Sequence, residues 1–149
     1  MDTAIIIPAR FDSSRFPGKP LIDILGKSMI HRVWQQCREV LPAANIFVAT
    51  DSEKIAEHCS KNNIQTLLTS VNCLTGTDRV YEASKKIQAN TIINVQGDEP
   101  LINPEDIKKV IEEAKKYPSQ IINAMCPILE EKDFRNVNIP KVVFRKDFQ

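Results

Sequence analysis

The 149-residue chain is 42% hydrophobic and 26% charged, a balance typical of one globular domain, which excludes an intrinsically disordered chain. Its 20 basic and 19 acidic residues give a formal net charge of +1, so no overall field is expected to attract nucleic acid or a membrane surface. The amino terminus has no basic segment, and its apolar run stops at Pro8, too early for a signal peptide or a membrane span. We therefore predict a cytoplasmic protein.

Short apolar runs in the sequence predict strands that are buried on both faces of a sheet. The clearest runs are 4–9, 46–50 and 91–95, and further strands are expected at 64–68, 121–128 and 141–145. Between these runs, apolar residues recur at helical spacing, which predicts that helices cover the sheet.

Capping residues mark where the helices are expected to begin. Ser28 is placed to cap a helix over residues 29–41, and Asp51 or Ser52 can open a second helix. Thr77 is expected to open a third. Asn103 followed by proline and two acidic residues predicts the start of a fourth helix.

Strands that alternate regularly with helices predict one α/β domain over residues 1–149. We expect a mainly parallel, doubly wound, Rossmann-like sheet with helices on both faces, because parallel neighbours need a helical crossover. Ligands of such sheets bind at the carboxyl ends of the strands. The loops after Ala9, Thr50 and Val95 are therefore the expected places for chemistry.

The cysteines show no spacing that is typical of a disulfide framework or a zinc site. His31 and His58 also stand at no ligand spacing from a pair of cysteines. We interpret all the cysteines as reduced packing residues, namely Cys37, Cys59, Cys73 and Cys126.

The loop after the first predicted strand concentrates positive charge. Residues 8–20 contain Arg10, Arg15 and Lys19 together with two serines and Gly18, which lets the backbone approach a ligand closely. Guanidinium and ammonium groups match the charge of a nucleoside triphosphate. The loop lacks the GxxxxGK[ST] and GxGxxG patterns, so kinase and dehydrogenase functions lose their main support. The alternative is a solvated loop whose basic side chains face water.

Four segments in this order resemble the 3-deoxy-manno-octulosonate cytidylyltransferase (CMP-Kdo synthetase) family. The first segment on its own also occurs in related sugar nucleotidyltransferases. The matching segments are Ile6-Ile7-Pro8-Ala9-Arg10 with Ser13-Ser14-Arg15-Phe16-Pro17-Gly18-Lys19-Pro20-Leu21, then Val48-Ala49-Thr50-Asp51, Thr75-Gly76-Thr77-Asp78-Arg79, and Asn94-Val95-Gln96-Gly97-Asp98-Glu99-Pro100.

The resemblance implies a fold of the nucleotide-diphospho-sugar transferase type and a role for each matching segment. Arg10, Lys19 and Asp98 are the implied catalytic residues, with Asp98 as the magnesium ligand. The implied nucleotide-binding residues are Pro8, Ala9, Arg10, Ser14, Arg15, Lys19, Thr75, Gly76, Thr77, Arg79 and Gln96.

These roles agree with the chemistry of the side chains. An amide such as Gln96 both donates and accepts hydrogen bonds, as reading of a pyrimidine requires. Magnesium prefers a carboxylate together with phosphate oxygens and water. The alternatives are that residues 96–98 only form a turn, that Thr77 and Asp78 only start a helix, and that Arg79 is simply exposed.

The implied reaction joins CTP and 3-deoxy-manno-octulosonic acid (Kdo) to give CMP-Kdo and pyrophosphate, for lipopolysaccharide or capsule synthesis. Two alternatives are activation of another acidic sugar and a non-catalytic nucleotide-binding fragment. Members of the resembled family continue well past the position of Gln149, through sugar-binding residues, a second metal-binding aspartate and much of the dimer contact. We therefore expect a truncated chain that is inactive by itself, and a homodimer at full length.

Overall fold

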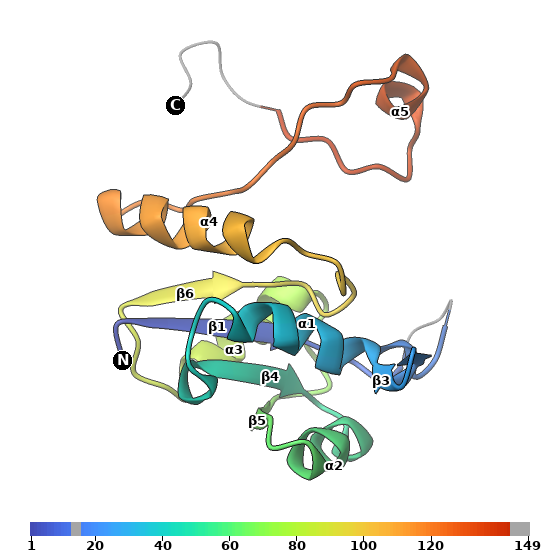
Figure 1. The fold of residues 1–149 in the computed structure, drawn as a ribbon, viewed down its shortest axis with the longest axis vertical. Coiled ribbons are helices and arrows are strands. Elements are labelled where there is room, and N and C mark those ends of the chain that lie inside the picture. The colour runs from blue at the N-terminus through green and yellow to red at the C-terminus, as the bar shows by residue number, and fades with distance from the viewer. Residues whose placement is uncertain (13–15, 144–149) are drawn as a thin grey trace.

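The computed structural model describes residues 1–12 and 16–143. Its centre is a four-stranded parallel sheet in the order β5-β4-β1-β6 (Figure 1). The strands are β1 (Thr3–Pro8), β4 (Ile46–Thr50), β5 (Gln65–Leu68) and β6 (Thr91–Asn94). The predicted Rossmann-like parallel sheet is confirmed.

Helices and short turns connect the strands. The helices are α1 (Met29–Arg38), α2 (Glu53–Lys61), α3 (Gly76–Ser84), α4 (Pro104–Lys116) and the short α5 (Glu131–Arg135). The sequence analysis missed α5 and three smaller features. These are a hairpin of β2 (Asp23–Ile24) and β3 (Lys27–Ser28), and the 3₁₀ turns η1 (Lys19–Leu21) and η2 (Ala43–Asn45). Within the described ranges, no helix is both long and apolar enough to cross a membrane.

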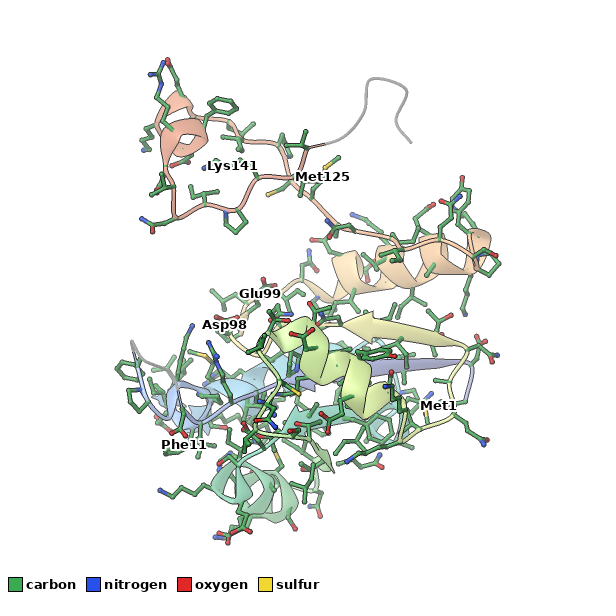
Figure 2. The ribbon with its side chains drawn as sticks, turned by 180° about the vertical axis from the view of Figure 1, so that it is seen from behind. Met1, Phe11, Asp98, Glu99, Met125 and Lys141 are labelled. Carbon is green, nitrogen blue, oxygen red and sulfur yellow. The ribbon has the colours of Figure 1, made fainter. Side chains whose placement is uncertain are left out.

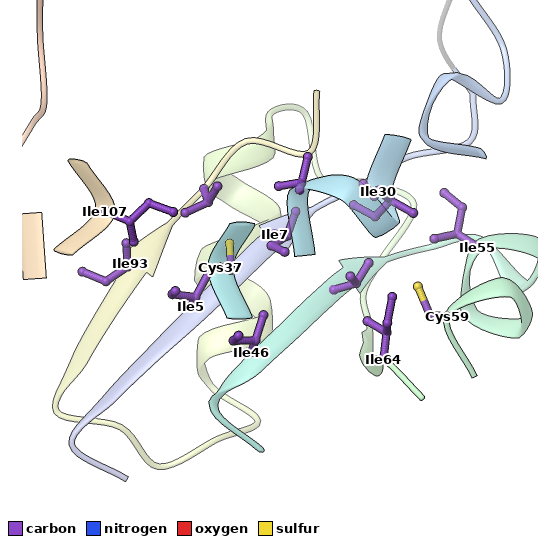
Figure 3. Close-up of a cluster of buried hydrophobic side chains, with 14 of the residues drawn as sticks. Ile5, Ile7, Ile30, Cys37, Ile46, Ile55, Cys59, Ile64, Ile93 and Ile107 are labelled. Atoms are coloured by element: carbon purple, nitrogen blue, oxygen red, sulfur yellow. The ribbon is translucent and has the colours of Figure 1, made fainter. Parts of the chain in front are cut away.

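The alternation of side chains along β1 creates a core on each face of the sheet. Ile5 and Ile7 are fully buried in the larger core, which receives apolar side chains from α1, α2 and α4 (Figure 3). Ile6 points to the other face and packs with Val80 and Ala83 of α3. Helices therefore cover both faces, as predicted.

Two of the buried side chains are cysteines. Cys37 of α1 and Cys59 of α2 are fully buried, and burial raises the pKa of their thiols to about 12 and about 11. The prediction that they are packing residues is confirmed. It is wrong for Cys126, which is exposed, and for Cys73, which is only half-buried beside a cavity.

The caps are largely where the sequence predicts them. Ser28 Oγ accepts a hydrogen bond from the backbone N–H of His31 at 3.3 Å, and Asn103 Oδ1 accepts one from the N–H of Glu105 at 3.0 Å. The third helix, however, begins at Gly76 rather than at Thr77. Its N-cap is Thr75, because Thr75 and Asp78 bond reciprocally in a capping box.

Residues 121–128 were predicted as a strand, and that prediction is wrong. The segment has no regular structure and lies away from the sheet (Figure 1). Its apolar side chains favour a strand, but a strand also needs a hydrogen-bonding neighbour. Residues 141–143 are also irregular, and the remainder of the predicted strand 141–145 lies outside the described residues.

A buried ion pair joins α3 to the end of β4. Arg79 is only 3% exposed, and its Nη2 lies 2.8 Å from Oδ2 of Asp51. A second guanidinium nitrogen, Nη1, donates to Thr69 Oγ1. The sequence alternative that Arg79 is exposed is therefore wrong.

We predict that Asp51→Ala lowers the free energy of unfolding by about 3 kcal/mol, because it leaves a buried guanidinium without its counter-charge. Glu113→Ala is the control, since it removes the exposed pair that Glu113 makes with Lys116 at 2.6 Å. The control should unfold nearly as the wild type does. Urea unfolding of the three proteins measures the difference, and equal midpoints would show that the Arg79 pair does not stabilise the fold.

Candidate nucleotide-binding site

A cavity of about 670 Å³ opens where β1 and β6 end. Three loops supply its walls: the loop after β1, the turn that starts α3, and residues 96–98 after β6. Figure 2 places Asp98 on this side of the molecule, at the same end of the sheet as Phe11. This is the edge at which a doubly wound sheet is expected to bind its ligand, and the volume is in the usual range for a ligand pocket.

Most of the site residues implied by the sequence line this single cavity. They are Pro8, Ala9, Arg10, Lys19, Thr75, Gly76, Arg79, Gln96 and Asp98. Thr77 is exposed on the first turn of α3 and is not among the lining residues. Ser14 and Arg15 lie outside the described residues, so their implied contacts stay predictions.

The sequence analysis missed the mainly apolar part of the wall. The additional lining residues are Phe16, Pro20, Ile22, Met29, Cys73 and Gly97. Phe16 and Pro20 belong to the first loop itself, and Ile22 and Met29 follow it, on either side of the β2–β3 hairpin. The proline and glycine content of residues 17–20 was the one signal of a turn in this loop, since Gly18 adopts a left-handed φ of 73°.

Two glycines allow the walls to approach one another. A Cβ on Gly97 would lie 2.5 Å from the carbonyl oxygen of Pro8, so only glycine fits against that backbone. A Cβ on Gly76 would lie 2.9 Å from Gln96 Oε1 and 3.2 Å from Cγ of Pro8. The Gln96 amide thus packs directly on the first residue of α3.

Opposite charges face each other across the cavity mouth. Nζ of Lys19 donates to Oδ2 of Asp98 at 2.7 Å, and the two side chains are 40% and 54% exposed. Arg10 is exposed nearby on the first loop. Because all three groups are accessible to solvent, an incoming polyanion can reach the cations without unfolding the core.

Arg79 contributes differently from these cations. Its guanidinium lines the cavity but is already bound to Asp51 and Thr69. Its charge is therefore neutralised inside the protein. The arrangement holds the beginning of α3, and with it Thr75 and Gly76, against the end of β4.

Cys73 is the thiol at the cavity wall, and it is not poised as a nucleophile. Burial raises its pKa, and the hydrogen bond that it donates to Glu82 Oε2 at 3.2 Å raises it further. Glu82 in turn has a lowered pKa, chiefly because its carboxylate accepts the backbone N–H of Ser70. The thiol therefore stays protonated at neutral pH.

The donor set at the cavity has one carboxylate, Asp98, suited to a hard divalent ion. Across residues 1–12 and 16–143, no group of three or more His, Cys, Asp or Glu side chains is placed to hold a metal. An ion at Asp98 would take its other ligands from phosphate oxygens and water. Magnesium is commonly bound in that way.

A family model described as cytidylyltransferase matches residues 4–149 of the chain. The chain belongs to the cytidylyltransferase family. All the loops that form the cavity lie within the matched residues.

Curated relatives from distant organisms support this assignment. The chain is 40% identical over 149 residues to 3-deoxy-manno-octulosonate cytidylyltransferase of Elusimicrobium minutum, a match that covers 99% of this chain and 60% of that protein. It is 41% identical over 140 residues to the mitochondrial enzyme of the same name from Arabidopsis thaliana, covering 93% of this chain and 48% of that protein. The chain thus spans about half to three-fifths of the length of these relatives.

A solved structure supports the fold. The structure of CMP:2-keto-3-deoxy-manno-octonic acid synthetase complexed with CTP matches with a TM-score of 0.76 and 38% sequence identity. The match covers 80% of this chain and 49% of that one. The resemblance read from the sequence motifs is therefore confirmed at the level of family and fold.

We predict that substitution by alanine mainly affects stability at Gly97 and mainly affects nucleotide binding at Gly76. Gly97→Ala should lower the free energy of unfolding by about 1–3 kcal/mol, because the new methyl group meets backbone that cannot move freely. Gly76→Ala should lower stability less than Gly97→Ala, since its methyl group meets the movable Gln96 amide and the Pro8 ring at 3.2 Å rather than backbone, but it should displace that amide and weaken nucleotide binding. Thermal unfolding and calorimetric titration with CTP measure the two effects. A Gly76→Ala variant that binds CTP as tightly as the wild type does would show that the Gln96 amide does not contact the bound nucleotide.

Proposed function

We propose that the protein is a cytidylyltransferase that activates a 3-deoxy-octulosonic acid sugar, forming CMP-Kdo and pyrophosphate from CTP and Kdo. The observation that carries this proposal is the single cavity that gathers the first loop, the start of α3 and residues 96–98. The relatives that are about 40% identical carry the name of this activity. The solved structural neighbour is a complex with CTP.

The side chains of the cavity divide into two groups with different tasks. Arg10 and Lys19 bind the triphosphate, because their exposed positive charges lie at the mouth. Gln96 reads the base, with Gly76 and Ala9 giving close backbone approach. Ser14 and Arg15 join the nucleotide contacts in this proposal, as the family resemblance implies, whereas Thr77 lies outside the cavity and is not included.

The reaction needs alignment and charge neutralisation rather than a covalent intermediate. The anomeric hydroxyl of the sugar attacks the α-phosphorus of CTP, and pyrophosphate leaves. Lys19 exchanges its bond to Asp98 for a phosphate oxygen when the nucleotide enters. Asp98 is then free to hold magnesium, which when bound neutralises phosphate charge.

We further propose that the full-length protein is a cytoplasmic homodimer. The apolar side chains exposed beyond α4 support this proposal, since Ile121 is 98% exposed, Leu129 88% and Val137 92%. Large apolar side chains exposed to this degree are typical of contact surfaces.

The identity of the sugar can be tested independently of the nucleotide. Pyrophosphate release by the full-length protein with CTP and magnesium should be fastest with Kdo in a panel of acidic sugars. A faster reaction with a nonulosonic acid would reassign the acceptor.

We predict that CTP binds more tightly than ATP, GTP or UTP, and that Lys19→Ala weakens CTP binding roughly tenfold to a hundredfold by removing a charge-assisted contact. Lys108→Ala is the matched control, because Lys108 is an exposed lysine of α4 that lies outside the cavity. Calorimetry of the three proteins with each triphosphate checks both parts. Equal affinity for ATP and CTP would contradict the role of Gln96 in reading the base. A Lys19→Ala variant that binds CTP as tightly as the wild type does would show that this lysine is simply solvated and does not bind phosphate.

We also predict that Asp98→Asn in the full-length enzyme abolishes magnesium-dependent turnover, because the amide keeps the shape but loses the charge that attracts the ion. Binding of CTP without metal should change much less. Pyrophosphate release and metal-free titration measure the two quantities. Full activity of this variant would show that Asp98 does not hold the metal and only shapes the turn.

A further inference from the structure

The side-chain amide of Gln96 is held between two neighbours. Its Nε2 donates a hydrogen bond to Oδ1 of Asn94 at 2.9 Å, and its Oε1 faces Gly76. A Cβ added to Gly76 would lie 2.9 Å from Oε1 and 3.5 Å from Nε2. The amide therefore has a defined orientation at the cavity wall before any ligand binds.

The surroundings favour this orientation over the flipped one. Gly76 is the first residue of α3, and the amino end of a helix carries partial positive charge that attracts an oxygen. A flipped amide would turn its NH₂ group toward the helix end and bring its Oε1 against Oδ1 of Asn94. The first change is unfavourable, and the second is unfavourable as long as Asn94 keeps its Oδ1 toward Gln96, so in this arrangement the two neighbours act in the same direction.

Asn94 is well placed to fix the amide without touching the ligand. It is the last residue of β6 and stands opposite Ile6 of β1, and the next backbone N–H, of Val95, donates to the Ile6 carbonyl at 3.2 Å. The sheet thus fixes its backbone, and its side chain is exposed. Gln96 and Gly76 line the cavity, whereas Asn94 does not.

The orientation of this amide matters because cytosine and uracil differ in the order of their donors and acceptors. Cytosine presents an amino donor at C4 beside an acceptor at N3, whereas uracil presents an acceptor at O4 beside a donor at N3. A glutamine amide that rotates freely by 180° can pair with either edge. An amide held in one orientation matches only one of them.

We propose that Asn94 is a positioning residue that locks the Gln96 amide and thereby sets the preference for cytosine over uracil. This inference rests on the proposed function, since it requires that the cavity bind the base of CTP. Asn94 acts through Gln96, and its contribution is to discrimination between pyrimidines rather than to the strength of phosphate binding.

The test compares two variants of Asn94 that differ in hydrogen bonding. Asn94→Leu is nearly the same size but offers no acceptor, so the amide is released. Asn94→Asp can only accept, so it holds the amide as in the wild type. The ratio of the dissociation constants for UTP and CTP is the readout, because the added charge of aspartate acts equally on the two triphosphates.

We expect Asn94→Leu to reduce this ratio by roughly tenfold, the effect of one hydrogen bond, while Asn94→Asp keeps it within about twofold of the wild type. Asn90→Leu is the matched control, because Asn90 precedes the other end of β6, and it should leave the ratio unchanged. Thermal unfolding of each variant verifies that it is folded.

The outcomes separate this inference from the proposed function. If the wild type prefers CTP and the Asn94→Leu variant keeps the same UTP-to-CTP ratio of dissociation constants, the positioning role is overturned and the proposed function is left intact. Loss of preference in Asn94→Asp as complete as in Asn94→Leu also overturns it. A wild type that binds neither triphosphate overturns the proposed function and the positioning role together.

Discussion

The central position of β1, which pairs in parallel with β4 on one edge and β6 on the other, is the constraint on which the site depends. Parallel pairing brings the loops that leave these strands to the same edge of the sheet. The register then places residues 95–98 directly beside the end of β1. The approach of Gly97 to the Pro8 carbonyl is a consequence of that register, and it closes the floor of the cavity.

The cations around this edge differ in how much of their charge is available. Arg79 is buried and its charge is matched by Asp51, so it serves to hold α3 in place. Lys19 and Asp98 are paired but accessible, which makes their bond exchangeable. A site of this kind keeps its cavity shaped by the buried pair, while the accessible pair remains free to respond to a charged ligand.

The start of α3 links the structural and the binding parts of the site. The capping box of Thr75 and Asp78 fixes the first turn locally, and Arg79 anchors the same turn to the sheet. Gly76 lies between these two supports and faces the Gln96 amide. Small changes at either support would therefore reach the part of the cavity that contacts the base in the proposed function.

The sequence by itself determined the features that depend on near neighbours. Apolar runs identified the four strands of the sheet, and Ser28 and Asn103 identified the start of two helices, because hydrophobic periodicity and capping act within a few residues. The motifs also named most of the cavity wall through the family resemblance.

Tertiary structure alone decided which distant residues meet. The partner of Arg79 lies 28 positions earlier in the chain, and nothing in the local sequence distinguishes a buried arginine from an exposed one. Residues 121–128 have the composition of a strand but pair with no strand among the described residues, and they are irregular there. The contact of Gln96 with Gly76 likewise required the fold, because it depends on how β6 and α3 are placed around β1.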